Sequence, residues 1–227
     1  MSVTPKKTAR KTPASKYEWR KTEKEFYLAK TEPAEIDVPP MNYFVADGAG
    51  SPADEEFQAV VGLLYTLSYT VRMMPKSGWT PPGYREYTVF PLEGIYRMNA
   101  DDWLPGGGLD KSKLRYRLMI RQPWFVTPEV VERARESARK KVSAELLARA
   151  SFETMSDGLS VQMLHVGTYD TEPETFAAMN AFLASRGLKR ANDVHREIYL
   201  SDPRRVAPEK NRTTLRFPNL PAHPGKT

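Results

Sequence analysis

Cysteine is absent from this sequence, histidine occurs three times, and no hydrophobic run is long enough to cross a membrane. Without cysteine the chain has no disulfide, no thiolate nucleophile and no cysteine-ligated zinc, a composition that fits a reducing cytoplasm. A membrane-spanning helix needs about 20 largely apolar residues. The basic N-terminal segment also lacks the apolar stretch of a secretory signal. We therefore expect a cytoplasmic protein with no membrane partner.

The motifs of several common enzyme classes are missing as well. No Gly-x-Gly-x-x-Gly follows a predicted strand, and the glycine run 106–108 lacks the Lys-Ser/Thr pair of a phosphate-binding loop. No Gly-x-Ser-x-Gly elbow is present. The three histidines, His165, His195 and His223, do not have the spacing of metal ligands. The dinucleotide, phosphate-loop and serine-elbow classes are therefore excluded, and we expect neither a cofactor nor a metal ion.

The net charge of +6 is concentrated near one end of the chain. Residues 1–30 hold nine Lys or Arg and three Asp or Glu, whereas the remaining 197 residues carry 25 of each sign. A tail rich in Lys, Thr, Pro and Ala, with no apolar period, is typical of disorder. Such a tail either solubilises the chain or attracts polyanions weakly and in a salt-sensitive way. It does not indicate a specific nucleic-acid partner.

The rest of the chain contains an internal repeat of strand, helix, strand and strand. In the first copy, the alternating pattern of Met41–Gly48 precedes Ser51–Asp54, which has the residues of a helix start. A helix follows over residues 55–73, because apolar residues recur there at helical spacing. Alternation then predicts strands over Tyr87–Met98 and Lys113–Arg121.

The second copy has the same order of elements. Ser160–Tyr169 has the pattern of a strand, and Thr171–Glu174 forms a capping box with a proline near the helix start. Gly187 stands where the helix should end, as a residue able to adopt a left-handed conformation. Strands are again predicted next, over Val194–Asp202 and Arg212–Pro218.

The two copies predict an α+β fold of tandem strand–helix–strand–strand modules, module one over residues 40–121 and module two over residues 160–218. Both long helices should lie on one side of the sheet. Between the modules, an apolar stripe predicts one connecting helix of about five turns over residues 127–149. The boundaries that follow are a disordered basic tail of residues 1–16, a folded domain of residues 17–218 and a C-terminal tail of residues 219–227.

Two loops rich in proline and glycine each carry a tryptophan. Trp79 lies in residues 75–86, and Trp103 lies in residues 99–112. A large aromatic side chain in such a loop either plugs the edge of the core or faces a ligand. The sequence leaves both interpretations open.

The last-but-one predicted strand carries a carboxylate among aromatic and polar groups. Strand alternation places four polar or aromatic side chains on one face: His195, Glu197, Tyr199 and Ser201. The other face, which we expect to meet the helices, carries Val194, Arg196, Ile198 and Leu200. The polar face is either solvated or lines a cavity with Glu197 as its charged floor. A carboxylate surrounded by aromatic rings suits a cationic or polarised aromatic ligand.

Glu93 is a second candidate acid, because it lies in the corresponding strand of module one. The following residue, Gly94, suggests a bulge or bend there. The direction of the Glu93 side chain is therefore harder to predict than that of Glu197.

Four segments of this sequence resemble stand-alone proteins of the GyrI-like small-molecule-binding family. They are HREIYLSDPRR (His195–Arg205), YTVFPLEG (Tyr87–Gly94), LYTLSYTVRM (Leu64–Met73) and GTYDTEPETFAAMNAFLASRGL (Gly167–Leu188). The resemblance covers about residues 17–218. It implies two modules related by a pseudo-two-fold axis, with a ligand groove between them. Glu197 matches the family's pocket glutamate, and Tyr199 would be its neighbour.

The resemblance also bears on activity. The family includes effector domains of multidrug-responsive transcription regulators, but only about 40 residues precede module one, too few for their DNA-binding domain. The tryptophan-bearing loops are similar to those of the branch whose members hydrolyse the cyclopropane ring of DNA-alkylating compounds in an aromatic cage. We expect the corresponding cage residues here to be Tyr65, Tyr69, Trp79, Trp103, Tyr169 and Tyr199.

Three functional hypotheses follow from the sequence. The chain binds amphipathic, aromatic or cationic small molecules, with Glu197 at the centre of the site. Alternatively, it hydrolyses such compounds with Glu197 as the catalytic acid or base. In the third hypothesis it inhibits a protein partner or sequesters a drug without catalysis, as the gyrase-inhibitor name implies. The sequence does not indicate the ligand or the oligomeric state.

Removal of residues 1–16 should leave the melting temperature and small-molecule binding nearly unchanged, because this segment has five basic residues, no acidic residue and almost no apolar surface. Thermal unfolding of the truncated and full-length chains, followed by circular dichroism, tests this. A fall of many degrees would identify the segment as a structural arm.

Overall fold

The computed structural model describes residues 15–97 and 110–222. Its strands are β1 (Ala34–Val38), β2 (Met41–Ala49), β3 (Leu92–Arg97), β4 (Arg115–Arg121), β5 (Ala150–Met155), β6 (Gly158–Val166), β7 (Leu188–Arg190), β8 (Val194–Tyr199) and β9 (Arg212–Pro221). Its α-helices are α1 (Trp19–Thr22), α2 (Lys24–Tyr27), α3 (Glu55–Met73), α4 (Pro128–Ala138), α5 (Ala144–Ala148) and α6 (Glu172–Ser185). Short 3-10 helices are η1 (Met74–Ser77), η3 (Lys111–Lys113), η4 (Tyr169–Thr171) and η5 (Pro208–Lys210).

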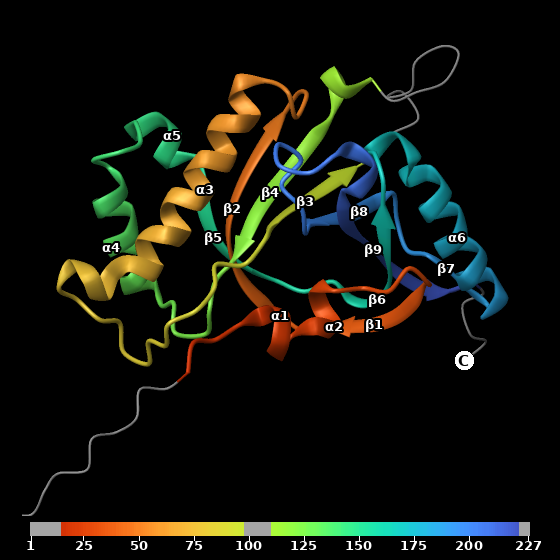
Figure 1. The fold of residues 1–227 in the computed structure, drawn as a ribbon, viewed down its shortest axis with the longest axis horizontal. Coiled ribbons are helices and arrows are strands. Elements are labelled where there is room, and N and C mark those ends of the chain that lie inside the picture. Colours follow the sequence, from red (N-terminus) through yellow and green to blue (C-terminus); the bar gives the residue numbers. More distant parts are fainter. Residues whose placement is uncertain (1–14, 98–109, 223–227) are drawn as a thin grey trace, which may run out of the picture.

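The strands form one antiparallel sheet in which the two modules lie side by side (Figure 1). The order along the sheet is β1-β6-β9-β8-β3-β4-β2-β5, and β7 pairs with β9. Module one contributes β2, β3 and β4, and module two contributes β6, β8 and β9. The arrangement β6-β9-β8 therefore mirrors β2-β4-β3, with β8 and β3 paired at the centre. This symmetry confirms the predicted α+β fold of two related modules.

The structure differs from the sequence prediction at several element boundaries. It contains the short strands β1, β5 and β7, which the patterns do not predict. It also has two helices where the pattern predicts one over residues 127–149. Helix α4 ends at Ala138, and Ser143 caps the separate helix α5 because its hydroxyl accepts a hydrogen bond from the Leu146 amide. The residues after α5 then form β5, which pairs with β2.

Both long helices pack on the same face of the sheet. Paired residues of neighbouring antiparallel strands point to one face, and one row of partners crosses the centre of the sheet: Leu215, Glu197, Gly94, Leu118 and Ala46. We call this side the helix face, because α6 packs over the Leu215 end of the row and α3 over the Leu118 and Ala46 end. The predicted placement of the helices is confirmed. Glu197 and Gly94 lie in the middle of the row, between the two helices.

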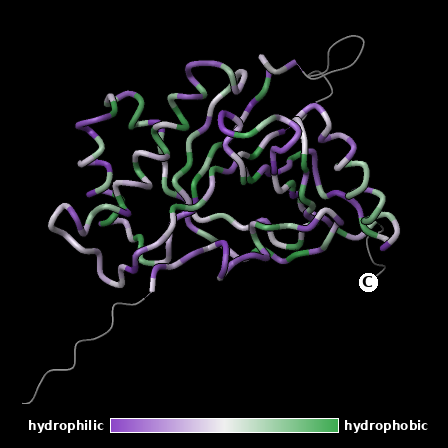
Figure 2. The backbone as a smooth tube through the Cα atoms, in the orientation of Figure 1, coloured by the Kyte–Doolittle hydropathy of each residue, from purple (hydrophilic) through white to green (hydrophobic). Residues whose placement is uncertain are grey.

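The hydrophobic core is divided in the same way. The cluster under α3 is the larger one, and its side chains include Val60, Leu64, Leu67, Phe44 and Ile120. The cluster under α6 consists of Val161, Met179, Leu183, Leu215 and Phe217. Figure 2 shows hydrophobic segments concentrated in the sheet and along the helices, with hydrophilic segments in the peripheral loops. The part of the helix face between the clusters, around Glu197 and Gly94, carries polar and aromatic side chains, and we call it the strip.

The opposite side of the sheet, the back face, carries a buried ionic network. Arg196 of β8 donates hydrogen bonds to Glu93 at 2.7 Å and to Asp157 at 2.6 Å. Arg216 of β9 donates to Asp157 at 3.2 Å and to the carbonyl oxygen of Phe26 in α2. Burial raises the pKa of the Glu93 carboxyl, against the lowering effect of Arg196. The network thus binds the centre of the sheet to the segment that contains α1 and α2.

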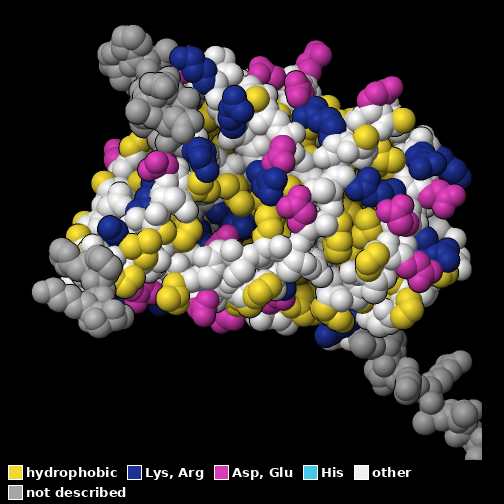
Figure 3. All heavy atoms as spheres, turned by 180° about the vertical axis from the view of Figure 1, so that it is seen from behind, with side chains coloured by type: hydrophobic (Ala, Val, Ile, Leu, Met, Phe, Trp, Pro, Cys, Tyr) yellow, Lys and Arg dark blue, Asp and Glu magenta, His cyan; other side chains and the backbone are white. Residues whose placement is uncertain are grey.

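The folded part of the chain extends slightly into the predicted N-terminal tail. The Arg85 guanidinium donates a hydrogen bond to the Ser15 carbonyl at 2.7 Å, and Lys16 forms an ion pair with Glu18. The last two residues of the predicted tail are therefore attached to the domain. Viewed from behind, the surface intersperses Lys and Arg with Asp and Glu (Figure 3). Among the helices of the described residues, none is both long and apolar enough to cross a lipid bilayer.

Replacing Arg196 with methionine should lower the free energy of unfolding by about 3–5 kcal/mol, because Glu93 and Asp157 would keep their burial but lose their shared cation. Chemical denaturation measures the change. Arg204, which is exposed in the β8–β9 loop, provides the control: Arg204→Met should alter stability by less than about 0.5 kcal/mol. Equal effects of the two substitutions would mean that the buried network contributes nothing specific.

Candidate functional site

Glu197 lies at the middle of the sheet, on the helix face, and its exposed fraction is 9%. The sequence prediction that the face of Val194, Arg196, Ile198 and Leu200 meets the helices is wrong. The face of Glu197 meets them, since the ring of His195 contacts Phe176 of α6 with centroids 4.9 Å apart. The reason is electrostatic: Arg196 takes the back face, where the buried Glu93 and the partly buried Asp157 bind it.

The Glu197 carboxylate is held by its neighbour on the same strand. His195 Nε2 lies 3.1 Å from Glu197 Oε1, and because a carboxylate only accepts hydrogen bonds, the imidazole donates. The His195 ring stacks on Tyr96 of β3 with centroids 5.8 Å apart. Glu197 therefore has a fixed orientation within a wall of aromatic rings.

Two tyrosines form a hydrogen-bonded pair beside this carboxylate. The hydroxyls of Tyr96 and Tyr199 lie 2.6 Å apart, and Tyr199 also hydrogen-bonds Glu197. Tyr169, which begins η4 just beyond β6, packs edge-on against Tyr199 with centroids 6.3 Å apart. Burial raises the pKa of both paired phenols well above its usual value, and the charge of Glu197 raises it further. The phenols thus remain neutral hydrogen-bond donors next to an anion.

Gly94 explains how Tyr96 reaches this position. The pairing of β3 with both neighbours is regular through Gly94, so the bulge suggested by the sequence is absent. A Cβ atom on Gly94 would lie 2.6 Å from the ring of Tyr96. The glycine therefore leaves room for that ring to lie flat beside Glu197. Sequence reasoning missed Tyr96, although its position two residues after Gly94 places the two on one face.

The predicted tyrosines of α3 lie on the other side of the strip. Tyr65 is half-buried and accepts a hydrogen bond from the backbone of Leu92 in β3, whereas Tyr69 is 46% exposed. Their rings lie 6.2 Å apart. Burial raises the pKa of Tyr65 and raises that of Tyr169 to about 12, and the carboxylate of Asp202 contributes to both. Asp202 is in the β8–β9 loop, which Figure 1 shows between α3 and α6.

The remaining predicted site residues lie elsewhere. Glu93 is on the back face, 1% exposed and paired with Arg196. Trp79 follows η1 and packs against the core under α3, with the guanidinium of Arg133 in α4 stacked 4.3 Å from its ring centroid. Trp103 lies outside the described residues. The structure thus brings together Glu197, Tyr199 and Tyr169, with Tyr65 and Tyr69 on the facing helix.

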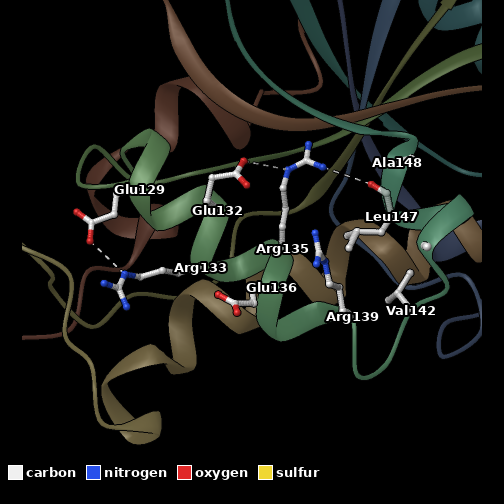
Figure 4. Close-up of a pocket in the computed structure, with 10 residues that line it drawn as sticks. Glu129, Glu132, Arg133, Arg135, Glu136, Arg139, Val142, Leu147 and Ala148 are labelled. Carbon is white, nitrogen blue, oxygen red and sulfur yellow. Dashed lines mark hydrogen bonds and ion pairs between the residues drawn. The ribbon is translucent and has the colours of Figure 1, made fainter.

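Two hollows lie away from Glu197. One, of about 830 Å³, is a cleft between α4 and α5, and two ion pairs line it, Arg133 with Glu129 and Arg135 with Glu132 (Figure 4). Arg135 of this cleft donates a hydrogen bond to the Leu147 carbonyl at 3.4 Å. The other, of about 490 Å³, lies between α2 and β1. None of the predicted site residues lines either hollow. Among the described residues there is no cluster of His, Asp and Glu side chains suited to a metal ion.

The raised phenol pKa values predict a loss of stability at alkaline pH. An unfolded tyrosine ionises near pH 10, whereas Tyr96, Tyr199 and Tyr169 hold their protons more tightly when folded. Their stabilising contribution is therefore full below about pH 10 and decreases as the pH rises above it. Ultraviolet absorbance of phenolate, recorded together with circular dichroism, should show these phenols ionising only as the fold is lost. Ionisation of all eleven tyrosines at the ordinary pKa, with the fold intact, would contradict this.

Comparisons with known proteins agree with this arrangement. The model of the GyrI-like small-molecule-binding domain matches residues 31–219. A hydrolase from Listeria innocua is 38% identical, with a TM-score of 0.81, over 90% of this chain and 100% of that chain. A second structure of a hydrolase from the same organism is 37% identical, with a TM-score of 0.83, over 91% and 100% of the two chains.

An uncharacterized conserved protein from Listeria innocua is also similar, at 38% identity and a TM-score of 0.82 over 90% of this chain and 100% of that chain. The comparison with curated proteins gave no match. The family model spans both modules and the whole of the central strip that carries Glu197. The chain therefore belongs to the family of GyrI-like small-molecule-binding domains.

Proposed function

We propose that the strip of sheet between α3 and α6 binds amphipathic small molecules that carry a positive charge or a polarised aromatic ring. The observation that supports this most directly is the position of Glu197. It is a nearly buried carboxylate whose hydrogen-bond partners, His195 and Tyr199, are both aromatic. No Lys or Arg forms an ion pair with it among the described residues. Its negative charge is thus available to a ligand.

The physical basis is the combination of charge and ring faces. A cation that leaves water loses hydration free energy, which a partly buried carboxylate and nearby aromatic π-faces can replace. Tyr169 and Tyr69, each more than a third exposed, offer ring surface at the two sides of the strip. Tyr65 and Tyr199 lie deeper. Ligand binding would then bury a planar molecule between the tyrosines of the two modules.

The other predicted residues differ in their expected contribution to ligand binding. Glu93 already has Arg196 as its partner and faces away from the strip, so we assign it to the fold. Trp79 lies under Arg133 of α4, and its replacement by alanine should have little effect on ligand affinity. Trp103 stays a predicted ligand-binding residue, and Trp103→Ala should cost about 1 kcal/mol of binding free energy.

Hydrolysis is the second candidate function. It is favoured by the hydrolases from Listeria innocua, which share more than a third of their residues with this chain. A cyclopropane conjugated to a carbonyl opens when the oxygen of water bonds to a ring carbon and the adjacent ring C–C bond breaks. The electron pair of that bond passes to the conjugated carbonyl, whose oxygen takes up the proton released by the water. Glu197 would orient or deprotonate that water, and the Tyr96–Tyr199 pair would donate a hydrogen bond to the carbonyl oxygen. Cyclopropane-containing DNA-alkylating compounds are the substrate class that we propose to test.

Glu197→Gln should weaken the binding of a planar cation by about 1–3 kcal/mol and spare a neutral ring system of the same shape, because only the charge is removed. Ethidium and the uncharged compound phenanthridine are suitable probes, and isothermal titration gives both affinities. Glu153→Gln, at a carboxylate of the edge strand β5, is the matched control and should change neither. Unaltered ethidium binding in Glu197→Gln would return Glu197 to a structural role.

The same substitution distinguishes a binder from a hydrolase. If the site opens a strained ring, Glu197→Gln should lower turnover much more than it weakens substrate binding, because the carboxylate would act mainly in the transition state. Product analysis by mass spectrometry, with and without enzyme, measures turnover directly. Equal rates for the wild type, the variant and buffer would exclude hydrolysis and leave the binding function.

A further inference from the structure

His195 is the hydrogen-bond partner of Glu197 whose side chain can change its charge near neutral pH. Histidine is the residue type that ordinarily gains or loses a proton between about pH 5 and pH 8. The His195 side chain is buried, and its Nε2 lies 3.1 Å from Glu197 Oε1. The charge of this imidazole therefore acts directly on the carboxylate that we propose as the binding group.

The hydrogen bond to Glu197 determines which nitrogen of the neutral ring carries the proton. Nε2 donates to the carboxylate, so Nδ1 holds a lone pair. Nδ1 is buried, and it has no hydrogen-bond partner among the described residues. An additional proton can therefore bind only at Nδ1. Adding it converts the neutral imidazole beside Glu197 into an imidazolium that forms an ion pair with the carboxylate.

The surroundings of the ring accommodate both charge states. Tyr96 of β3 stacks on His195, with centroids 5.8 Å apart and ring planes inclined by 26°, and an aromatic face attracts a cation. Glu197 attracts the imidazolium as well. Against this, the Nδ1–H of the charged ring would be buried without an acceptor among the described residues, which is unfavourable. These opposing contributions leave the ring free to titrate.

The phenols beside Glu197 do not change their charge in this pH range. The hydroxyls of Tyr96 and Tyr199 lie 2.6 Å apart. An ordinary phenol keeps its proton up to about pH 10, and burial raises the pKa of both well above that value. Under mildly acidic conditions the net charge at this point of the sheet thus depends on the carboxylate itself and on His195.

The elements on the helix side of His195 carry two further charged groups. Phe176 of α6 contacts the imidazole edge-on, with centroids 4.9 Å apart, and Glu172 lies one turn earlier on the same helix. The guanidinium of Arg190 in β7 lies 5.7 Å from the Phe176 centroid. An arginine stays charged throughout the range in which histidine titrates. The titration of His195 is therefore distinguished from that of Glu172 by a variant of His195 itself.

We propose that His195 is a positioning residue whose charge state decides whether the Glu197 site holds a cation. This inference rests on the proposed binding function. With a neutral ring, His195 and Glu197 together carry one negative charge, which a cationic ligand compensates. With a protonated ring the pair is neutral, and the ligand meets a like charge beside the carboxylate. The site therefore binds cations at neutral pH and releases them under mildly acidic conditions.

Protonation of His195 and cation binding are then reciprocal. A proton that weakens cation binding by a given factor is itself bound more weakly, by the same factor, once the cation is present. Cation binding in the mildly acidic range must therefore release protons into solution. A histidine that only fills space or only fixes Glu197 would show no such release.

Isothermal titration of the full-length chain with ethidium, a permanently charged quaternary cation, tests this proposal. From about pH 8 to about pH 5.5 the affinity of the wild type should fall by about tenfold. At about pH 6, titrations in buffers of different ionisation enthalpy should show proton release on binding. His195→Gln keeps an N–H donor for Glu197 but does not titrate. It should bind ethidium within about threefold of the wild type at about pH 8, vary by less than about threefold over the range and release no proton.

His165→Gln is the matched control, because His165 is also buried but its ring bonds Thr175 and the Thr168 carbonyl instead of a carboxylate. It should keep the pH dependence of the wild type. Constant affinity of the wild type, or binding without proton release, would overturn the proposal without recourse to any variant. The wild-type pH dependence in His195→Gln would overturn it too, and in each case the binding function stands. If ethidium does not bind the wild type at about pH 8, the binding function itself fails.

Discussion

The pairing of β8 with β3 is the interaction on which the rest of the structure depends. These strands belong to different modules, and their hydrogen bonds join two half-sheets into one. Each module brings its own helix and its own hydrophobic cluster, so the junction lies between α3 and α6. A polar residue at the junction is therefore largely buried, but polar and aromatic side chains surround it instead of aliphatic ones. Glu197 occupies that place opposite Gly94.

The two faces of β8 carry side chains with different roles. On the back face Arg196 joins Glu93, Asp157 and the N-terminal segment into a buried network, which fixes the strand from behind. On the helix face, His195 and Tyr199 are the hydrogen-bond partners of Glu197 among the described residues. A rigid backbone at this point holds the carboxylate in one place.

The modules, their order and the helices on one side could be predicted from the sequence, because strand alternation, helix starts and the repeat all depend on local patterns. Which face of β8 meets the helices could not be predicted. Both faces contain polar residues, and hydropathy alone does not separate them. The deciding information is the presence of Asp157 and Glu93, distant in sequence, behind Arg196. The place of Tyr96 at the site could not be predicted for a related reason. Its partners, Tyr199 and His195, both belong to the other module.

Spatial proximity could be predicted where one strand carried the information and could not where several elements had to meet. Glu197 and Tyr199 are two apart on β8, so their common face follows from geometry alone. Trp79 lies in a loop rich in proline and glycine, whose path no local pattern determines, and it packs beside α4 under Arg133. The predicted single connecting helix failed in the same way. Ser143 begins a second helix, but the apolar residues recur at helical spacing on both sides of it, so their pattern does not indicate the break.

The neighbouring opposite charges of Arg196 and Glu197 on β8 also favour one alignment of the two half-sheets. A slip of one residue would turn Arg196 toward the tyrosines and Glu197 toward Asp157 and Glu93, which would place three carboxylates together without a cation from β8. Such a pairing is electrostatically unfavourable, whereas hydrophobic residues at the same positions would tolerate it. The charge pattern that places Glu197 among the tyrosines on one side therefore also disfavours a shifted alignment of β8.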